Sequence, residues 1–466
     1  MQDSLLSVIS TVTLYMFNYV LPFLLASVGI WYSFQTKFVQ VRCFFEGIRT
    51  IHKNMTFTGE RQKVGITPFR ALVNGIGAQV GIGNIVGASS AILIGGPGAI
   101  FWMWIIAFFG MATSYAETVC ALGTRTVDLN GTVKGGPVYY ILTAFKSHFG
   151  KFLAAFFAVS TIISAGLSIF MLQSNSIASN LNETFGIPNW ATGVVLVIIC
   201  GFILQGGIER ISAVTEKIVP IMSYIFIGGA IAVLIARIQY VPEAVYMIFY
   251  YAFEPQAIIG GGFGEAFKIA VSQGVKRGLF SNEAGKGSTP HVHAQANVDN
   301  PHLQGIIAMH GVFFDTFIIL TLNALVIIST LYTSDGILAN GYSGDVTAVV
   351  NSGNLAQAAF GSVLDASNYE GFGAQFISLC LFLFAFSTML VTYTFGKVNV
   401  AYLFGDKNVR GYFIVVLLLI FIGTLTGNEF VWEINDLSNG CMVIPNALAL
   451  FSLTNLVKHY CTDLKG

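Results

Sequence analysis

Long apolar runs separated by short polar stretches recur along the whole chain. An apolar run of 18 or more residues is long enough to cross the hydrocarbon core of a bilayer as an α-helix. The hydropathy pattern predicts eleven such segments, near residues 11–34, 70–96, 98–122, 152–180, 190–207, 217–238, 262–292, 303–331, 371–396, 410–427 and 437–457. We therefore expect an all-α, polytopic membrane protein with eleven transmembrane helices and no sizeable soluble domain.

The composition agrees with this pattern and narrows the function classes. Hydrophobic residues make up 55% of the chain and charged residues only 10%, whereas a soluble protein carries about a quarter charged residues. The formal net charge is zero, which gives no electrostatic footprint for nucleic-acid binding. The six cysteines are scattered without a CxxC pair, and the motifs of zinc proteases, serine hydrolases and P-loop enzymes are missing. We expect neither an enzyme nor an obligate protein partner.

Basic residues predict how the chain is oriented in the membrane. The loop that follows the first segment, residues 35–70, holds seven Lys and Arg residues, whereas the loop at 332–370 holds none and has four acidic residues. Loops rich in Lys and Arg stay in the cytoplasm, and eleven alternating spans place these two loops on opposite sides. We expect a multi-pass protein of the plasma (inner) membrane, with its N-terminus outside and its C-terminus in the cytoplasm.

The second predicted span contains an unusual concentration of glycine. The stretch "NGIGAQVGIGNIVGASS", residues 74–90, holds five glycines, and glycine is a poor helix former. Non-helical backbone survives inside a membrane only where it lines a cavity or a ligand, and there its carbonyl groups coordinate cations while half-helix N-termini hold carboxylates. The alternative is close helix packing through small residues.

A second interrupted span favours the binding-site interpretation. The stretch 264–293 begins apolar and then meets Lys276, Arg277, Glu283 and Lys286, which mark either a transport pathway or buried ion pairs. It lies five spans after the glycine-rich one, and an odd offset reverses the direction through the bilayer. The single domain, 1–466, is therefore expected to be a 5+5 inverted repeat of helices 2–6 (69–238) and 7–11 (262–458), with an extra N-terminal helix (1–36). The site is expected where the two broken helices meet.

Three longer motifs resemble the alanine or glycine:cation symporter family. They are "GGPGAIFWMWIIAFFGMATSYAE" (95–117), "GGPVYY" (135–140) and "QGVKRGLFSNEAGKGSTPHVHA" (273–294). The resemblance runs along nearly the whole chain and implies the leucine-transporter fold, coupling to a sodium ion and a small neutral amino acid as substrate. It also implies roles for "GAQVGIGN" (77–84). The carbonyl groups of Gly77 and Val80 would face sodium, the amides of Ile82 and Gly83 the substrate carboxylate, and the carbonyls of Ala78 and Gln79 its ammonium group.

The same resemblance implies the remaining sodium ligands in "LFLFAFSTMLV" (381–391). They are the carbonyl group of Phe384 and the hydroxyl groups of Ser387 and Thr388, and hard cations prefer such oxygen donors. Alternatively, both hydroxyls bond back to carbonyls of their own helix. Gln173 resembles a position of the substrate cavity, or it is a packing amide. In the second break, Phe280 and Asn282 are expected beside the substrate, where an aromatic ring could close over a small ligand.

One departure from the family pattern bears on the substrate. Thr392 stands where the family usually has a tryptophan that bounds the substrate side chain. A smaller, polar wall would favour a larger polar amino acid such as glutamine, asparagine or serine over alanine or glycine. Glu117 and Asp315 are lone acids in apolar spans, and Asp315 would serve a second cation site, a proton relay or a hydrogen-bonded structural role.

The sequence thus predicts import of a small neutral amino acid by sodium symport with alternating access across the lipid bilayer. The alternatives are a proton-coupled amino-acid transporter and a passive channel.

Overall fold

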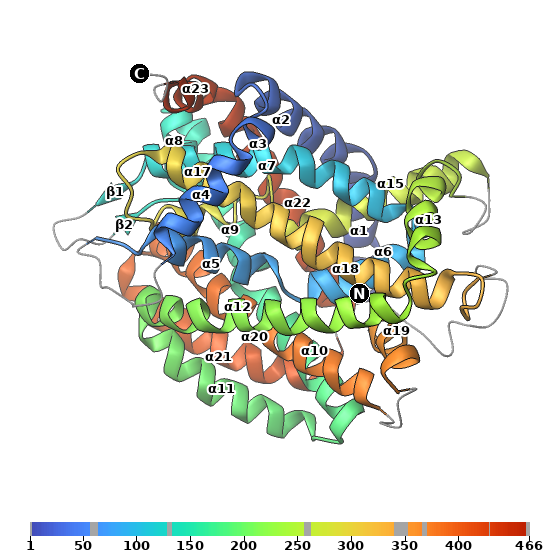
Figure 1. Cartoon of the computed structure of the whole chain (residues 1–466). Helices are drawn as coiled ribbons and strands as arrows, with labels where there is room; N and C mark the ends of the chain where they lie inside the picture. The colour runs from blue at the N-terminus through green and yellow to red at the C-terminus, as the bar shows by residue number, and fades with distance from the viewer. Residues whose placement is uncertain are drawn as a thin grey trace.

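The computed structural model describes residues 2–55, 64–127, 133–255, 262–339, 353–365, 371–427 and 429–462. These residues are helical apart from connecting turns, one isolated bridge and a hairpin of β1 (Thr126–Val127) and β2 (Val133–Lys134). Most long helices run side by side across the view of Figure 1, with the hairpin at one end of the bundle and α13 (Val241–Phe253) and α19 (Leu355–Leu364) at the other. The all-helical prediction is confirmed for this part of the chain.

Within the described ranges, seven helical stretches are long and apolar enough to cross a membrane. They are formed by α1, η1 and α2 (Gln2–Tyr15, Met16–Val20 and Leu21–Gln35); α7 (Ala99–Gly123); α9, η3 and α10 (His148–Ile163, Ser164–Ser168 and Ile169–Phe185); α12 (Gly207–Ala236); α17, η4, α18 and η5 (Pro301–Val312, Phe313–Leu320, Thr321–Ile327 and Ile328–Tyr332); α20 (Phe372–Phe404); and η8 with α21 (Asp406–Asn408 and Val409–Leu425).

Two further pairs of helices pass the same test but are bent at a short break. One pair joins α5 (Pro68–Gln79) to η2 and α6 (Gly83–Gly87 and Ala88–Gly95) at 48°, and the other joins α22 (Glu429–Ser452) to α23 (Thr454–Thr462) at 61°. The remaining helices are shorter or more polar: α3 (Val39–Arg42), α4 (Phe44–Asn54), α8 (Pro137–Ala144), α11 (Asn189–Gln205), α15 (Phe263–Asn282) and α16 (Pro290–His293). The count of eleven spans, the inverted repeat and the positions of the termini stay predictions.

The glycine-rich span is broken where the sequence predicts it. Helix α5 ends at Gln79, Val80 has a non-helical backbone (φ −78°, ψ 89°), and the chain becomes helical again from Ile82. The amide of Gly81, inside the break, donates to the side-chain oxygen of Asn84 at 3.1 Å. Asparagine thus gives the exposed backbone a local partner that a continuous helix would otherwise supply.

The second break begins directly after Asn282, which was expected inside the break together with Phe280. Helix α15 continues through Lys276 and Arg277 to Asn282, and Glu283 then turns into the left-handed region with φ 59°. Gly285 and Gly287 follow with φ 84° and 81°, a conformation that glycine adopts without a steric penalty. The motif "EAGKG" (283–287) therefore forms the break itself, while the charged residues before it are accommodated within the helix.

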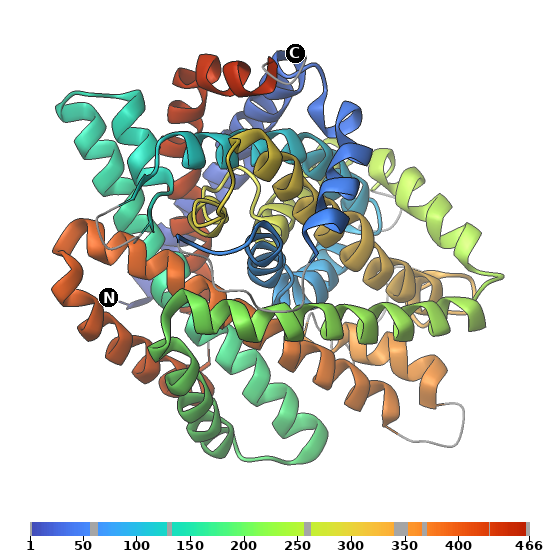
Figure 2. The same ribbon diagram turned by 60° about the vertical axis from the view of Figure 1, so that its left-hand side comes forward.

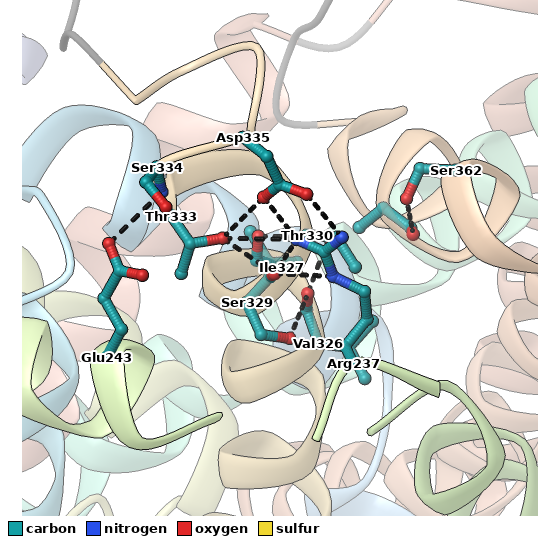
Figure 3. Close-up of polar contacts among 11 residues, drawn as sticks. Arg237, Glu243, Val326, Ile327, Ser329, Thr330, Thr333, Ser334, Asp335 and Ser362 are labelled. Carbon is teal, nitrogen blue, oxygen red and sulfur yellow. Dashed lines mark hydrogen bonds and ion pairs between the residues drawn. The ribbon is translucent and has the colours of Figure 1, made fainter. Parts of the chain in front are cut away.

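Helix α12 connects the broken span to the rest of the bundle. It packs against α5 and α20, and Figure 2 shows it crossing the bundle in green. Near its start, Glu216 forms an ion pair with Arg70 of α5. At its other end, the guanidinium of Arg237 bonds Asp335 and the carbonyl oxygen of Ser329, as Figure 3 shows. Ion pairs therefore hold α12 at both ends.

Candidate ion and substrate site

The five oxygen atoms expected to bind sodium lie together between the end of α5 and the middle of α20. The Thr388 hydroxyl oxygen lies within hydrogen-bond distance of three carbonyl oxygens, those of Gly77 (3.0 Å), Phe384 (3.1 Å) and Val80 (3.5 Å). The Ser387 hydroxyl lies 2.9 Å from the Phe384 oxygen and 3.3 Å from the Gly77 oxygen. Residues more than 300 positions apart in the chain thus place three carbonyls and two hydroxyls in one cluster.

The chemistry of this cluster suits a hard, singly charged cation. All five groups are neutral oxygen donors, and Ser387 and Thr388 are buried. Each hydroxyl bonds a carbonyl of its own helix, as the alternative interpretation expects, but each also reaches across to α5. A hydroxyl can rotate so that its lone pairs, instead of its proton, face the centre of the cluster. Hydrogen bonds within α20 alone do not explain why both hydroxyl groups also lie against carbonyl oxygens of α5.

A narrow pocket lies directly beside this cluster. Its walls come from the break after α5, from η3 and α10, from the end of α15, and from α20 and α22. Thr388 of the oxygen cluster also faces it. Six of the eight residues expected to contact substrate line the pocket: Ala78, Gln79, Gly83, Gln173, Phe280 and Thr392. The ion and substrate positions expected from the sequence are therefore neighbours in space.

Two expected substrate residues do not line the pocket. Ile82 is fully buried at the start of η2. The Asn282 side chain caps the end of α15, because its oxygen accepts from the amide of Ala284 at 3.1 Å and its nitrogen donates to Thr316 at 3.3 Å. The carbonyl oxygen of Asn282 instead accepts a hydrogen bond from the Gln79 side chain at 2.7 Å, so the two breaks are joined.

Helix α22 also contributes to the pocket, which the hydropathy pattern did not predict. This helix begins at Glu429, whereas the hydropathy pattern predicts a span only from 437. Asn435 and Asn439, one helical turn apart, line the pocket, and their side-chain oxygens accept from the Ser164 hydroxyl at 3.2 and 2.6 Å. Ser164 opens the π-helical segment η3, and such segments occur frequently at functional sites.

The charged residues of the second break are paired. Lys286 and Glu283 form an ion pair at 2.7 Å at the edge of the pocket, and the second Glu283 oxygen accepts from Ser288 at 2.9 Å. Earlier in α15, Lys276 pairs with Asp436 of α22 at 2.6 Å, and the Arg277 guanidinium lies 5.5 Å from the centre of the Trp432 ring. The interpretation of these charges as structural pairs agrees with this arrangement.

Asp315 sits in a network of hydrogen bonds next to the first break. Its buried carboxylate accepts from the Asn84 amide at 2.7 Å, from the Thr316 hydroxyl at 2.9 Å and from the Ser281 hydroxyl at 3.0 Å. Because Asn84 also accepts from Gly81, the carboxylate is linked to the broken backbone. The geometry agrees with a hydrogen-bonded structural role. It also places the hydroxyl oxygens of Thr316 and Ser281 next to the carboxylate, as a second cation site would require.

Glu117 has a similar position beside the second break. One of its oxygens accepts from the backbone amide of Gly287 at 3.0 Å and from the side chain of Asn446 at 2.6 Å. Its other oxygen has no partner among the described residues. Glu117 therefore holds the turn of the second break in place from α7.

Comparison with known proteins identifies the family. The model of the sodium:alanine symporter family matches residues 2–465. The chain belongs to the sodium:alanine symporter family. It is a transporter and not an enzyme, and its apolar helices make it a multi-pass membrane protein.

Relatives of this symporter family member carry names that differ in substrate. The sodium/alanine symporter AgcS of Methanococcus maripaludis is 36% identical over 455 residues, covering 97% of this chain and 95% of the relative. The Bacillus subtilis protein named "Probable sodium/glutamine symporter GlnT" is 35% identical, with 93% and 85% covered. Among solved structures, a manganese transporter from Eremococcus coleocola covers 85% of this chain, and the chain covers 81% of it, at 16% identity and a TM-score of 0.48.

Proposed function

We propose that the protein imports a neutral amino acid together with sodium, and that sodium is bound by the oxygens of Gly77, Val80, Phe384, Ser387 and Thr388. The observation that carries the proposal is the convergence of these five neutral oxygens at a break in a membrane-spanning helix. Neutral oxygens replace the hydration shell of a cation without binding it so tightly that it cannot leave. Membership of a sodium:alanine symporter family supports the choice of sodium.

The pocket beside the cluster is proposed to hold the amino acid. Although Ile82 does not line the pocket, its amide and that of Gly83 begin a half-helix, which would favour the substrate carboxylate. The carbonyls of Ala78 and Gln79 would offer acceptors for its ammonium group. Thr392 lines the pocket and gives it a small polar wall. Relatives are named for alanine and for glutamine, which agrees with a neutral amino acid of either size.

Transport is proposed to follow alternating access. Sodium would join α5 to α20, substrate would complete the pocket, and the bundle would then open on the other side. An inward sodium gradient drives such uptake, since each charge crossing about 100 mV contributes about 2.3 kcal/mol. The site would thus face each side of the membrane in turn.

The test is sodium-dependent uptake of neutral amino acids by the purified protein in proteoliposomes. Thr388→Val and Ser387→Ala each remove one proposed ligand, so the sodium concentration for half-maximal uptake is expected to rise roughly 10- to 100-fold, as for loss of a hydrogen bond to a charged group. Ser378→Ala is the control, because Ser378 is buried on the same helix but bonds Thr184 and Gln357. Equal sodium dependence in all three variants would contradict the proposed ion site.

A proton-coupled transporter is the second candidate, and the Asp315 network favours it most. A proton carrier has to gain and lose a proton during the cycle, and Asp315 is a buried carboxylate tied to the first break through Asn84. Uptake that ignores sodium, collapses with the pH gradient and loses its pH dependence in Asp315→Asn would support this candidate. A passive channel, by contrast, would never accumulate substrate against its gradient.

A further inference from the structure

Helix α22 presents two buried amide side chains to the substrate pocket. Asn435 and Asn439 lie one turn apart, and both accept a hydrogen bond from Ser164. Asn435 has no exposed surface and Asn439 is 3% exposed. They line a wall that is separate from the broken backbone of α5, which is proposed to bind the amino and carboxyl groups of the substrate.

Polar atoms at this pocket lack partners. The amide nitrogen of Asn435 and the amide oxygen of Gln173 are buried and make no hydrogen bond within the described part of the chain. A buried polar atom without a partner costs about 1–3 kcal/mol, so a ligand in the pocket that completes these atoms would gain affinity. If the Asn435 amide were turned over, its oxygen would be the unpartnered atom instead. In either orientation, one polar atom of the Asn435 amide has no hydrogen-bond partner among the described residues.

Contacts on both sides of Asn435 hold it in this position. Asp436 pairs with Lys276 of α15 at 2.6 Å, and Trp432 packs on Phe280 with ring centres 5.3 Å apart. Phe280 itself lines the pocket. Because these contacts fix α22 against the end of α15, the amide is already oriented before a ligand arrives, which reduces the entropy lost on binding.

We propose that Asn435, supported by Asn439 and Gln173, recognises the side chain of the transported amino acid. This inference rests on the proposed function. The wall offers both donors and acceptors, so the matching substrate is a neutral amino acid whose side chain carries a carboxamide, with glutamine as the test compound. At the edge of the pocket, the opposite charges of Glu283 and Lys286 neutralise each other, so they do not favour a substrate with a charged side chain.

The test compares kcat/KM for sodium-driven uptake of glutamine and of alanine in proteoliposomes. In the unmodified protein the ratio of glutamine to alanine is expected to exceed one. Asn435→Leu replaces the side-chain amide with an apolar group of similar size, and the ratio is expected to fall at least tenfold. Asn435→Ser keeps a hydroxyl group and is expected to give an intermediate ratio. The control is Asn399→Leu: Asn399 is equally buried on α20 but bonds His291 and the Phe395 carbonyl. It is expected to leave the ratio unchanged.

Two results would overturn the inference. One is a ratio below one in the unmodified protein. The other is a ratio that stays the same in Asn435→Leu and Asn435→Ser, since a purely structural role would lower both rates together. If Asn435→Leu does not fold, the serine variant and Asn439→Ala decide by the same ratio. Failure of the proposed function looks different, because the unmodified protein would then show no sodium-driven uptake of either amino acid.

Discussion

The buried ion pair of Arg70 and Glu216 gives a quantitative test of alternating access. Arg70 stands at the start of α5, on the side of the molecule that the sequence predicts to be cytoplasmic. Its Nε and Nη2 atoms donate to one oxygen of Glu216 at 3.0 and 2.9 Å, and the two side chains are 10% and 6% exposed. The pair thus links the broken helix α5 to α12 on the side of the proposed site that is predicted to be cytoplasmic. We expect the ion pair to be formed when the site is closed to the cytoplasm.

The expected effect of breaking the pair follows from its burial. Removing one partner of a buried ion pair costs about 3–5 kcal/mol, because the other charge is left uncompensated. In Arg70→Met the lone Glu216 would regain water when this side opens, so the cost falls on the closed state. The remaining exposure of the pair favours the lower limit, which corresponds to a shift of roughly 100-fold toward the open state. Arg70→Met with Glu216→Leu removes both charges and should restore most of the closed population.

Accessibility of the pocket measures this shift. Thr392→Cys, in a background with the native cysteines replaced, places a reporter in the pocket for a membrane-impermeant maleimide applied to inverted vesicles. Labelling should be about 100-fold faster in Arg70→Met and near the starting rate in the double variant. Lys134→Met is the control, since its pair with Asp406 at 3.5 Å is exposed and surface pairs contribute little. Unchanged labelling in Arg70→Met would refute the reasoning.

Two further predictions concern the opposite end of α12 and the break in α5. The Arg237 guanidinium lowers the pKa of Asp335 to about 2, so the contribution of this pair to stability is complete above about pH 4 and is lost as the pH falls toward 2. The difference in Tm between the unmodified protein and Asp335→Asn should therefore be constant from pH 8 to 5 and shrink below pH 4. In Gly81→Ala the new methyl would lie 2.5 Å from the Thr388 hydroxyl and 3.1 Å from the Gln173 amide, so sodium and substrate affinity should fall together in uptake assays.

Local sequence indicated a weakened helix at the first break, whereas the oxygen cluster was expected only from the resemblance to a family. Five glycines in a membrane span weaken the helix within a short window, and no other part of the chain is needed to see this. The resemblance of "GAQVGIGN" implied Gly77 and Val80 as ligands, and that of "LFLFAFSTMLV" implied Phe384, Ser387 and Thr388. Their convergence within 3.5 Å depends on tertiary packing, which only the resemblance to a family anticipated.

Charge pairing explains why the start of α22 was misplaced. The acidic residues between 429 and 436 lowered the hydropathy of the first turns of α22, so the span was predicted only from 437. In the fold Lys276 and Asp436 neutralise each other. A hydropathy window counts each charge alone, so it assigned the first turns of α22 to a loop. The predicted start at 437 left Asn435 outside the span, whereas Asn439 lay inside it without any local signal that it lines a pocket.

The ion cluster and the pocket share the same piece of backbone, and this has a thermodynamic consequence. Thr388 bonds the carbonyls of Gly77 and Val80 and also lines the pocket, while Gln79, between those two residues, is a pocket wall. An ion that orders this segment would order the pocket as well, so the two ligands cannot bind independently. Linkage requires that sodium and substrate raise each other's affinity by the same factor. Coupling in this protein would then need no separate transmission path, because both proposed ligands would use the peptide groups of one broken turn.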